Sequence, residues 1–268
     1  MPGASEPGLA SRQPTGQTPR PPRTRRRRWG RRLLRAFLGV VVLAVAAGGA
    51  AYALTPSVAD APARVRALAH QDGASHLGEP VPRRFAESIV ASEDSRFYSE
   101  PGIDPVGVAR AVWMTVTRSG VDPGGSTLSQ QLAKQLYTHG HGGLRNDAVQ
   151  VALAVKLNLH YSKQQILRMY ADTVYFGHGF YGLYDASCGY FAVPPPRLTL
   201  AQASTLAGLV QAPSAYDPLR HPRLARDRQQ YVLGRLAATG TVTPARARAA
   251  ARAPLGLHTA GSAAGCHG

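Results

Sequence analysis

The chain has 268 residues and a net charge of +16, and 44% of its residues are hydrophobic. This length and apolar content exclude a wholly disordered chain, because they are enough to form a sizeable core. The chain has only two cysteines, which excludes a scaffold built on disulfides and a four-cysteine zinc site.

The first 35 residues carry most of the positive charge. They contain ten arginines and one acid, Glu6, and so hold +9 of the total; most of their other residues are Pro, Gly, Ser and Thr. We therefore expect residues 1–35 to form a disordered basic tail. Such a tail could bind nucleic acid. The apolar segment that follows instead favours a signal for membrane topology, and we expect no nucleic-acid partner.

Residues 36–54 contain no charged side chain. As a helix, this segment would span about 28 Å, close to the hydrocarbon thickness of a bilayer. The preceding arginines predict a single-pass anchor in the cell membrane, with a cytoplasmic N-terminus and residues 55–268 outside. A cleavable signal is the alternative, since Ala51-Tyr52-Ala53 resembles a cleavage site. On either reading the folded part lies outside the cytoplasm, where Cys188 and Cys266 form a disulfide or remain two thiols.

The remaining sequence predicts a mainly α fold. Apolar residues recur at helical spacing, as at Leu128, Leu132 and Leu136, and alternating β-branched runs are few. The predicted organisation is a juxtamembrane linker at 55–83, a globular domain at 84–236 and an Ala/Arg-rich C-terminal tail at 237–268.

Two adjacent carboxylates, Glu93 and Asp94, follow an apolar helical stretch. Neighbouring carboxylates can have different surroundings, and one with a raised pKa can accept a proton from a sugar hydroxyl. The simpler alternative is a solvated acidic pair at the end of a helix.

A second motif covers residues 124–134. Two glycines lead into a Ser/Thr helix start, and Gln130 and Lys134 share one helix face. An amide, an ammonium group and free backbone N–H groups together suit an anion such as a phosphate. An ordinary capped amphipathic helix is the alternative.

Two other stretches carry less information. His139 and His141 lie in a glycine-rich loop without a ligand pattern, so a polar loop is favoured over a metal site. Aromatic residues alternate with glycines at 175–182, which predicts a tight turn that another segment or a sugar approaches closely.

Together and in this order, these motifs resemble the peptidoglycan glycosyltransferase family, the glycosyltransferase module of penicillin-binding proteins that also occurs as monofunctional enzymes. The resemblance covers roughly residues 84–236. Its motifs here are Glu93-Asp94 with Phe97, Gly102 and Asp104; Gly124-Gly125-Ser126-Thr127 with Gln130-Gln131 and Lys134; Ser162-Lys163; Ile166-Leu167 through Tyr170 to Gly177; and Ala207-Gly208-Leu209 through Gln211-Ala212-Pro213 to Pro218.

The resemblance implies a lysozyme-like domain that polymerises membrane-bound lipid II into a growing glycan strand. Glu93 would be the general base on the acceptor 4-hydroxyl, and attack with inversion would release polyprenyl pyrophosphate. A divalent cation, Mg or Mn, could accompany the pyrophosphate, and other cell-wall synthesis proteins could be partners. Asp94 and Gln150 would support the base. The residues that would bind substrate or pyrophosphate are Ser126, Thr127, Gln130, Gln131, Lys134, Arg145 and Lys163.

The chain departs from the family pattern at several positions. Glu100 stands where the family has histidine, and Asn146-Asp147 where it has an Arg-Lys pair, although a one-residue shift would let Arg145 serve as the arginine. Gln150 replaces a second glutamate and cannot carry its negative charge.

Three functions therefore remain open. The first is a polymerase, with activity that these departures could reduce, and the second is an impaired lipid II-binding scaffold protein. The third is a lysozyme-like hydrolase with Glu93 as general acid, against which the second motif argues. A penicillin-sensitive transpeptidase is not expected, because the sequence has no S-x-x-K or K-T-G motif.

Overall fold

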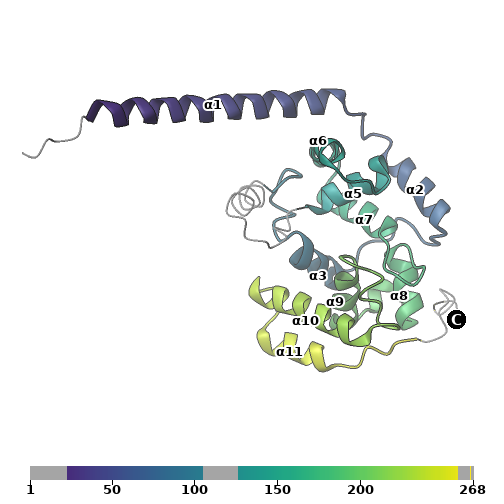
Figure 1. Ribbon diagram of the computed structural model, residues 1–268. Coiled ribbons are helices and arrows are strands. Elements are labelled where there is room, and N and C mark those ends of the chain that lie inside the picture. The colour runs from purple at the N-terminus through teal and green to yellow at the C-terminus, as the bar shows by residue number, and fades with distance from the viewer. Residues whose placement is uncertain (1–22, 105–125, 259–265, 267–268) are drawn as a thin grey trace, which may run out of the picture. The chain divides into compact units, whose positions relative to one another are not determined.

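The computed structural model describes residues 23–104, 126–258 and 266 (Figure 1). The described residues form helices and one isolated bridge between Tyr175 and Tyr181, which confirms the predicted mainly α fold. The chain divides into two units, Met1–Ala47 and Gly48–Gly268. Gly124, Gly125 and the first part of the basic tail lie outside the described residues.

The helices follow one another along the chain with short connections. They are α1 (Arg23–Leu54), α2 (Ala61–Asp72), α3 (Arg83–Glu93), α5 (Leu128–Thr138), α6 (Leu144–His160), α7 (Lys163–Thr173), α8 (Leu183–Phe191), the 3-10 turn η1 (Pro195–Arg197), α9 (Leu200–Leu209), α10 (Pro222–Ala238) and α11 (Pro244–Arg252).

Helix α1 includes the predicted apolar segment and extends beyond it. Its part Leu34–Leu54 is long and apolar enough to cross a membrane. The helix begins at Arg23, so the expectation of disorder is wrong for residues 23–35. Arginine and leucine are good helix formers, and no proline interrupts this stretch.

Residues 55–83 are more than a linker, because α2 lies within them. Pro62 occupies the first turn, where its missing N–H costs nothing, and Gly73 ends the helix at φ +75°. Ala61, Val65 and Ala69 are buried, since α2 packs against α5 and α7. The folded domain therefore begins before residue 84.

The C-terminal segment is also part of the core rather than a tail. Helix α11 packs on α9 and α10, and Val242, Ala247 and Leu255 are buried. Gln202 Nε2 donates a hydrogen bond to the Leu255 carbonyl at 2.9 Å. Apolar residues are sparse among the arginines here, which hid this packing from the sequence pattern.

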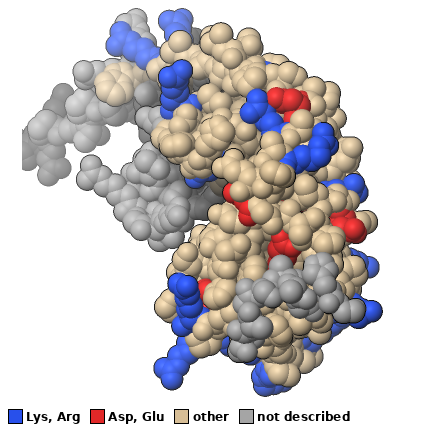
Figure 2. Space-filling model, turned by 90° about the vertical axis from the view of Figure 1, so that its right-hand side faces the viewer, with Lys and Arg blue, Asp and Glu red and all other residues tan. Residues whose placement is uncertain are grey.

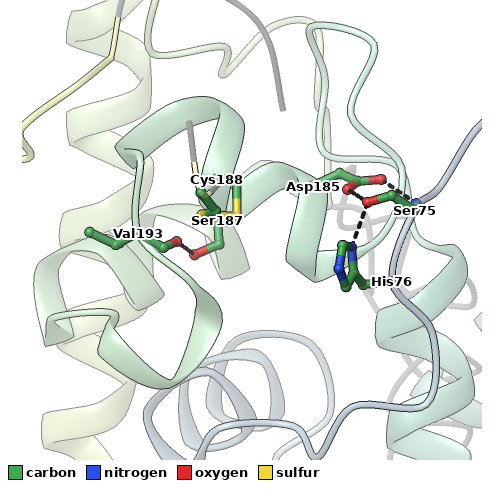
Figure 3. Close-up of a disulfide and its surroundings, with 7 residues drawn as sticks. Ser75, His76, Asp185, Ser187, Cys188 and Val193 are labelled. Carbon is green, nitrogen blue, oxygen red and sulfur yellow. Dashed lines mark hydrogen bonds between the residues drawn. A yellow bond between two sulfur atoms is a disulfide. The ribbon is translucent and has the colours of Figure 1, made fainter. Parts of the chain in front are cut away.

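The two cysteines form a disulfide between α8 and the C-terminus (Figure 3). The Cα atoms of Cys188 and Cys266 are 5.3 Å apart, and Cys188 is fully buried. Next to it, the Ser187 hydroxyl donates to the Val193 carbonyl at 2.6 Å. Of the two alternatives left open by the sequence, the structure has the bridge, which covalently closes the segment containing α9, α10 and α11.

Helix α3 belongs to the Gly48–Gly268 unit. It packs against α9 and α10, and its Phe85 ring lies 5.9 Å from that of Phe176. Buried Phe85 and Ile89 hold the helix in place, and its last residue is Glu93. The packing thus fixes the position at which Glu93 leaves the helix.

Candidate active site

Glu93 is held by side chains from two other helices. Its Oε1 lies 3.1 Å from Arg228 Nη2 of α10, and its Oε2 accepts a 3.3 Å hydrogen bond from Gln131 Nε2 of α5. The Glu93 side chain is 13% exposed. Burial raises its pKa, which Arg228 and Gln131 partly offset. A desolvated carboxylate that keeps some access to solvent is suited to accept a proton.

Gln131 is itself oriented by a buried tyrosine. The Tyr170 hydroxyl donates a 2.8 Å hydrogen bond to Gln131 Oε1. Because the amide oxygen is engaged there, the Nε2 group is directed at Glu93. Tyr170, from α7, is fully buried, so the amide orientation is set by the core.

Arg228 is fixed on several sides. Its Nε donates to the Gly208 carbonyl at 3.3 Å, and its guanidinium carbon lies 4.5 Å from the ring centroid of Tyr231 and 5.8 Å from that of Tyr216. A Cβ added at Gly208 would lie 3.0 Å from Arg228 Cγ, so the glycine leaves room for this side chain. With its side chain 11% exposed, Arg228 places a fixed positive charge beside Glu93.

Asp94 has different surroundings from Glu93, which is one of the two alternatives that the sequence leaves open. Its Oδ2 accepts a 3.0 Å hydrogen bond from the Leu128 backbone N–H in the first turn of α5. Burial raises the pKa of Asp94, which is itself a buried residue. Asp94 therefore ties α3 to the start of α5.

Glu100 and Lys163 lie in the interior near Asp94. Burial and the Asp94 carboxylate raise the pKa of Glu100 to about 8. The Lys163 ammonium is buried 4.5 Å from the Phe97 ring centroid, and burial lowers its pKa against the attraction of Glu100 and Asp94. This inward position differs from the expected contact of Lys163 with substrate, which stays a prediction.

The second motif forms the start of α5. Thr127 and Gln130 make a capping box, in which the Thr127 hydroxyl accepts from Gln130 N at 3.1 Å and Gln130 Oε1 accepts from Thr127 N at 2.9 Å. The Thr127 hydroxyl also donates to the Gly102 carbonyl at 2.8 Å. Both side chains thus stabilise the helix start, and their predicted role in binding pyrophosphate is untested.

The other predicted binding residues are more open to solvent. Ser126 is exposed next to the helix start, and Lys134 is partly exposed, three residues beyond Gln131 on the same face of α5. Arg145 is exposed in the first turn of α6. The structure therefore brings Gln131 to Glu93, while the predicted contacts of Ser126, Lys134 and Arg145 with a ligand stay predictions.

Gln150 acts as a hydrogen-bond donor. Its Nε2 donates to Thr138 Oγ1 and to the His141 carbonyl, both at 2.9 Å, and the residue is 7% exposed. These bonds join α6 to the end of α5 and to the loop after it. A carboxylate has no hydrogen to donate to these two acceptors, so glutamine suits this position.

The glycine-aromatic stretch forms the predicted tight turn. Gly177 has φ +86°, and a Cβ there would lie 2.6 Å from the Pro213 carbonyl oxygen. The Tyr190 hydroxyl donates to the Phe176 carbonyl at 3.0 Å. The close approach of the segment around Pro213 confirms that another segment meets this turn.

The described residues do not form a protein-bound metal site. No group of three or more His, Cys, Asp or Glu side chains in this part of the chain could hold an ion. Glu93 faces Arg228, and the Gln150 amide has no charge. We therefore derive no step that requires a metal held by the chain.

The sequence reasoning missed Arg228 and the positioning role of Tyr170. Arg228 lies in an arginine-rich helix with no distinctive spacing. The glycine at 208, within a quoted motif, was the available signal, because it marks a close approach by another side chain.

Comparison with known proteins supports the resemblance to glycosyltransferases that the sequence motifs indicate. A transglycosylase family model matches residues 64–237. The chain is 39% identical to penicillin-binding protein 1F of Bacillus subtilis over 66% of its length and 25% of the relative. It is 35% identical to a Cupriavidus necator protein named "Putative transglycosylase" over 85% of its length and 99% of that protein.

The chain thus spans about a quarter of the penicillin-binding protein and nearly all of the shorter relative. The crystal structure of penicillin-binding protein 1A from Haemophilus influenzae aligns at TM-score 0.40 and 21% identity, over 66% of this chain and 17% of that one. The assignment depends on the sequence matches rather than on this likeness. The chain belongs to the transglycosylase family and carries a peptidoglycan glycosyltransferase module.

Proposed function

We propose that the protein polymerises lipid II into glycan strands at the outer surface of the cell membrane, with release of polyprenyl pyrophosphate and with Glu93 as general base. The observation that carries this proposal is the Glu93 carboxylate, partly exposed and held between Arg228 and Gln131. Family membership supports the reaction class.

In the proposed reaction, Glu93 accepts the proton of the acceptor 4-hydroxyl as its oxygen attacks the donor anomeric carbon. The bond from that carbon to the pyrophosphate oxygen breaks, and its electron pair leaves with the pyrophosphate, so the anomeric centre inverts. Developing negative charge on the leaving group is stabilised by fixed cations and donors. Lys134 suits this role, because it lies on the same face of α5 as Gln131.

An apolar stripe on α6 supports a position at the bilayer. Ala148, Val151, Val155 and Leu159 follow one helix face, with Val151 36% and Leu159 71% exposed. Beside this stripe, Lys156 Nζ donates a 2.6 Å hydrogen bond to the carbonyl of Thr55, directly after the last residue of α1. The stripe thus lies close to Thr55, the residue that follows the apolar helix, which supports the proposal that this face of α6 meets the membrane.

The second candidate is an impaired lipid II-binding protein. The observation in its favour is Gln150, whose amide joins two segments but supplies no negative charge. The two candidates predict the same binding of lipid II and differ in the formation of glycan strands.

The test is polymerisation of lipid II by the full chain, with and without magnesium and the inhibitor moenomycin. We expect wild type to form strands and Glu93→Gln to lower the rate by roughly 10²–10⁴-fold while lipid II binding persists. Glu87→Gln is the control, because Glu87 is on the same helix and its ion pair is with Arg83 rather than with a residue of the site. Binding without strand formation by wild type would favour the second candidate. Cleavage of finished glycan without release of pyrophosphate would identify a hydrolase.

A further inference from the structure

Beyond the basic N-terminal region, the positive charge is concentrated in α10 and α11. Residues 36–268 carry +7, and residues 222–252 alone hold +6, with seven arginines and one acid, Asp227. Figure 2 shows Lys and Arg side chains at the lower end of the molecule, at the height of α10 and α11 in Figure 1. This charge therefore belongs to one helical hairpin.

Three of these arginines have internal roles. Arg228 faces Glu93, Arg226 Nη1 donates to the carbonyls of Ala251 and Ala253, and Arg235 Nε donates to the Ala91 carbonyl. In contrast, Arg248 and Arg252 are exposed and have no ion-pair partner within the described parts of the chain. Their positive charge is available to a partner.

Arg248 and Arg252 lie along a groove between α10 and α11 with a volume of about 450 Å³. From α10 the groove is lined by Leu233, Gly234 and Ala237, and from α11 by Ala247 and Ala251. A Cβ at Gly234 would meet no atom within 4 Å, so the groove is open there. On both helices the lining residues are spaced three and four apart, the spacing that receives another helix.

We propose that this groove binds an amphipathic helix of a partner protein that carries acidic residues along its flank. The partner's apolar face would contact Gly234, Ala237 and Ala251. Its Asp or Glu side chains would pair with Arg248 and Arg252, which lie four residues apart and so share one side of α11. The proposal does not depend on the glycosyltransferase reaction.

The chain itself offers no segment of the required charge. Residues 1–22 and 105–125 each contain two arginines and one acid, and residues 259–268 contain no acid. A second copy of the hairpin would bring arginines against arginines. Charge complementarity therefore points to a different, acidic protein.

The test uses the full chain in a neutral detergent and a fluorescent synthetic helix of about 20 residues, with Ala and Leu on one face and Glu beside it. Fluorescence anisotropy measures its affinity against a scrambled peptide of the same composition. We expect the helix to bind at least about tenfold more tightly than the scrambled peptide, and added salt to weaken its binding.

The variants locate the site. The double variant Arg248→Glu with Arg252→Glu should weaken binding about tenfold or more, and Gly234→Leu should weaken it by filling the groove. Arg246→Glu is the matched control, because Arg246 is exposed on α11 but does not line the groove. If the charge-reversed variant unfolds, as circular dichroism would show, Arg248→Gln with Arg252→Gln takes its place.

Three results would overturn the proposal. The first is equal binding of the helical and scrambled peptides, and the second is binding that the groove variants leave unchanged. The third is displacement of the peptide by phosphatidylglycerol in mixed micelles but not by an equal amount of phosphatidylcholine, which would assign the arginines to a lipid surface instead.

Discussion

Replacing Arg228 should shift the pH dependence of the reaction, because its guanidinium lies 3.1 Å from the Glu93 carboxylate. At this separation two unit charges interact by about 5 kcal/mol at an effective dielectric constant of about 20, and by about 1 kcal/mol in water. Both side chains are slightly exposed, so solvent screening keeps the result in the lower half of this range, at about 1.4–2.8 kcal/mol. Since a pKa unit corresponds to about 1.4 kcal/mol, Arg228→Met should raise the pKa of Glu93 by roughly 1–2 units.

A general base acts in its ionised form, and its raised pKa moves the acidic limb of the rate profile to higher pH. At a pH below the wild-type pKa of Glu93, Arg228→Met should therefore lose about tenfold to a hundredfold in kcat/KM, and the activity should recover as the pH rises above the new pKa. Arg228→Lys keeps a positive charge and should show a smaller shift. Its ammonium cannot reproduce the guanidinium contact with Gly208.

The assay is lipid II polymerisation at a series of pH values, with thermal unfolding of each variant measured in parallel. A purely structural role for Arg228 would lower the rate by the same factor at every pH. That result would refute the electrostatic argument. The electrostatic argument would also be contradicted if the acidic limb of the rate profile moved equally far in Arg228→Lys and in Arg228→Met, because the charge of residue 228 would then not be the cause.

Three further predictions concern stability and are measured by denaturant unfolding of the full chain. Gln150→Glu removes two buried hydrogen-bond donors and should lower the free energy of unfolding by about 2–4 kcal/mol, and by less at low pH, where the new carboxyl is protonated. Gln150→Met is its control, because it removes the same hydrogen bonds without adding a charge. Replacing both Cys188 and Cys266 by serine should cost about 2–5 kcal/mol, since the bridge spans 78 residues, and a reducing agent should affect only wild type. Gly177→Ala should cost about 2 kcal/mol or more, with Gly179→Ala as a control that lacks the clash although it shares the positive φ. If any of these variants unfolded with an unchanged free energy, the contact that it removes or disturbs would not stabilise the fold as stated.

The sequence predicted the parts of the fold that depend on local patterns. The Ser/Thr start of α5, the helical spacing of its leucines and the turn around Gly177 are all encoded by neighbouring residues. Glu93 could be proposed as the general base from the sequence, because the motif that contains it is also made of neighbouring residues. The predicted start at residue 84 was too late, because α2, which buries Val65 beside small residues such as Ala61, packs on α5 and α7 and the family match begins at residue 64. The predicted end at residue 236 agrees with the family match to residue 237, but α11 beyond it still packs on α10.

The remaining features depend on contacts between distant segments. The pairing of Arg228 with Glu93 joins residues 135 positions apart, and no periodicity within α10 distinguishes Arg228 from its neighbours. The inward position of Lys163 depends in the same way on Phe97 and Glu100 from an earlier segment. The role of Gln150 as a hydrogen-bond donor could not be predicted from the sequence, because it depends on two acceptors, Thr138 and His141, that face its side chain in the fold.

Glu93 is held by residues 131 and 228, which belong to two helices, α5 and α10, that are made one well after the other. A chain still emerging from the ribosome would already contain every quoted motif through Pro218 and yet lack α10. The carboxylate would then have no guanidinium beside it. The Glu93–Arg228 pair thus cannot form until α10 has been made, so a polypeptide truncated before residue 222 would present the carboxylate without its counter-charge.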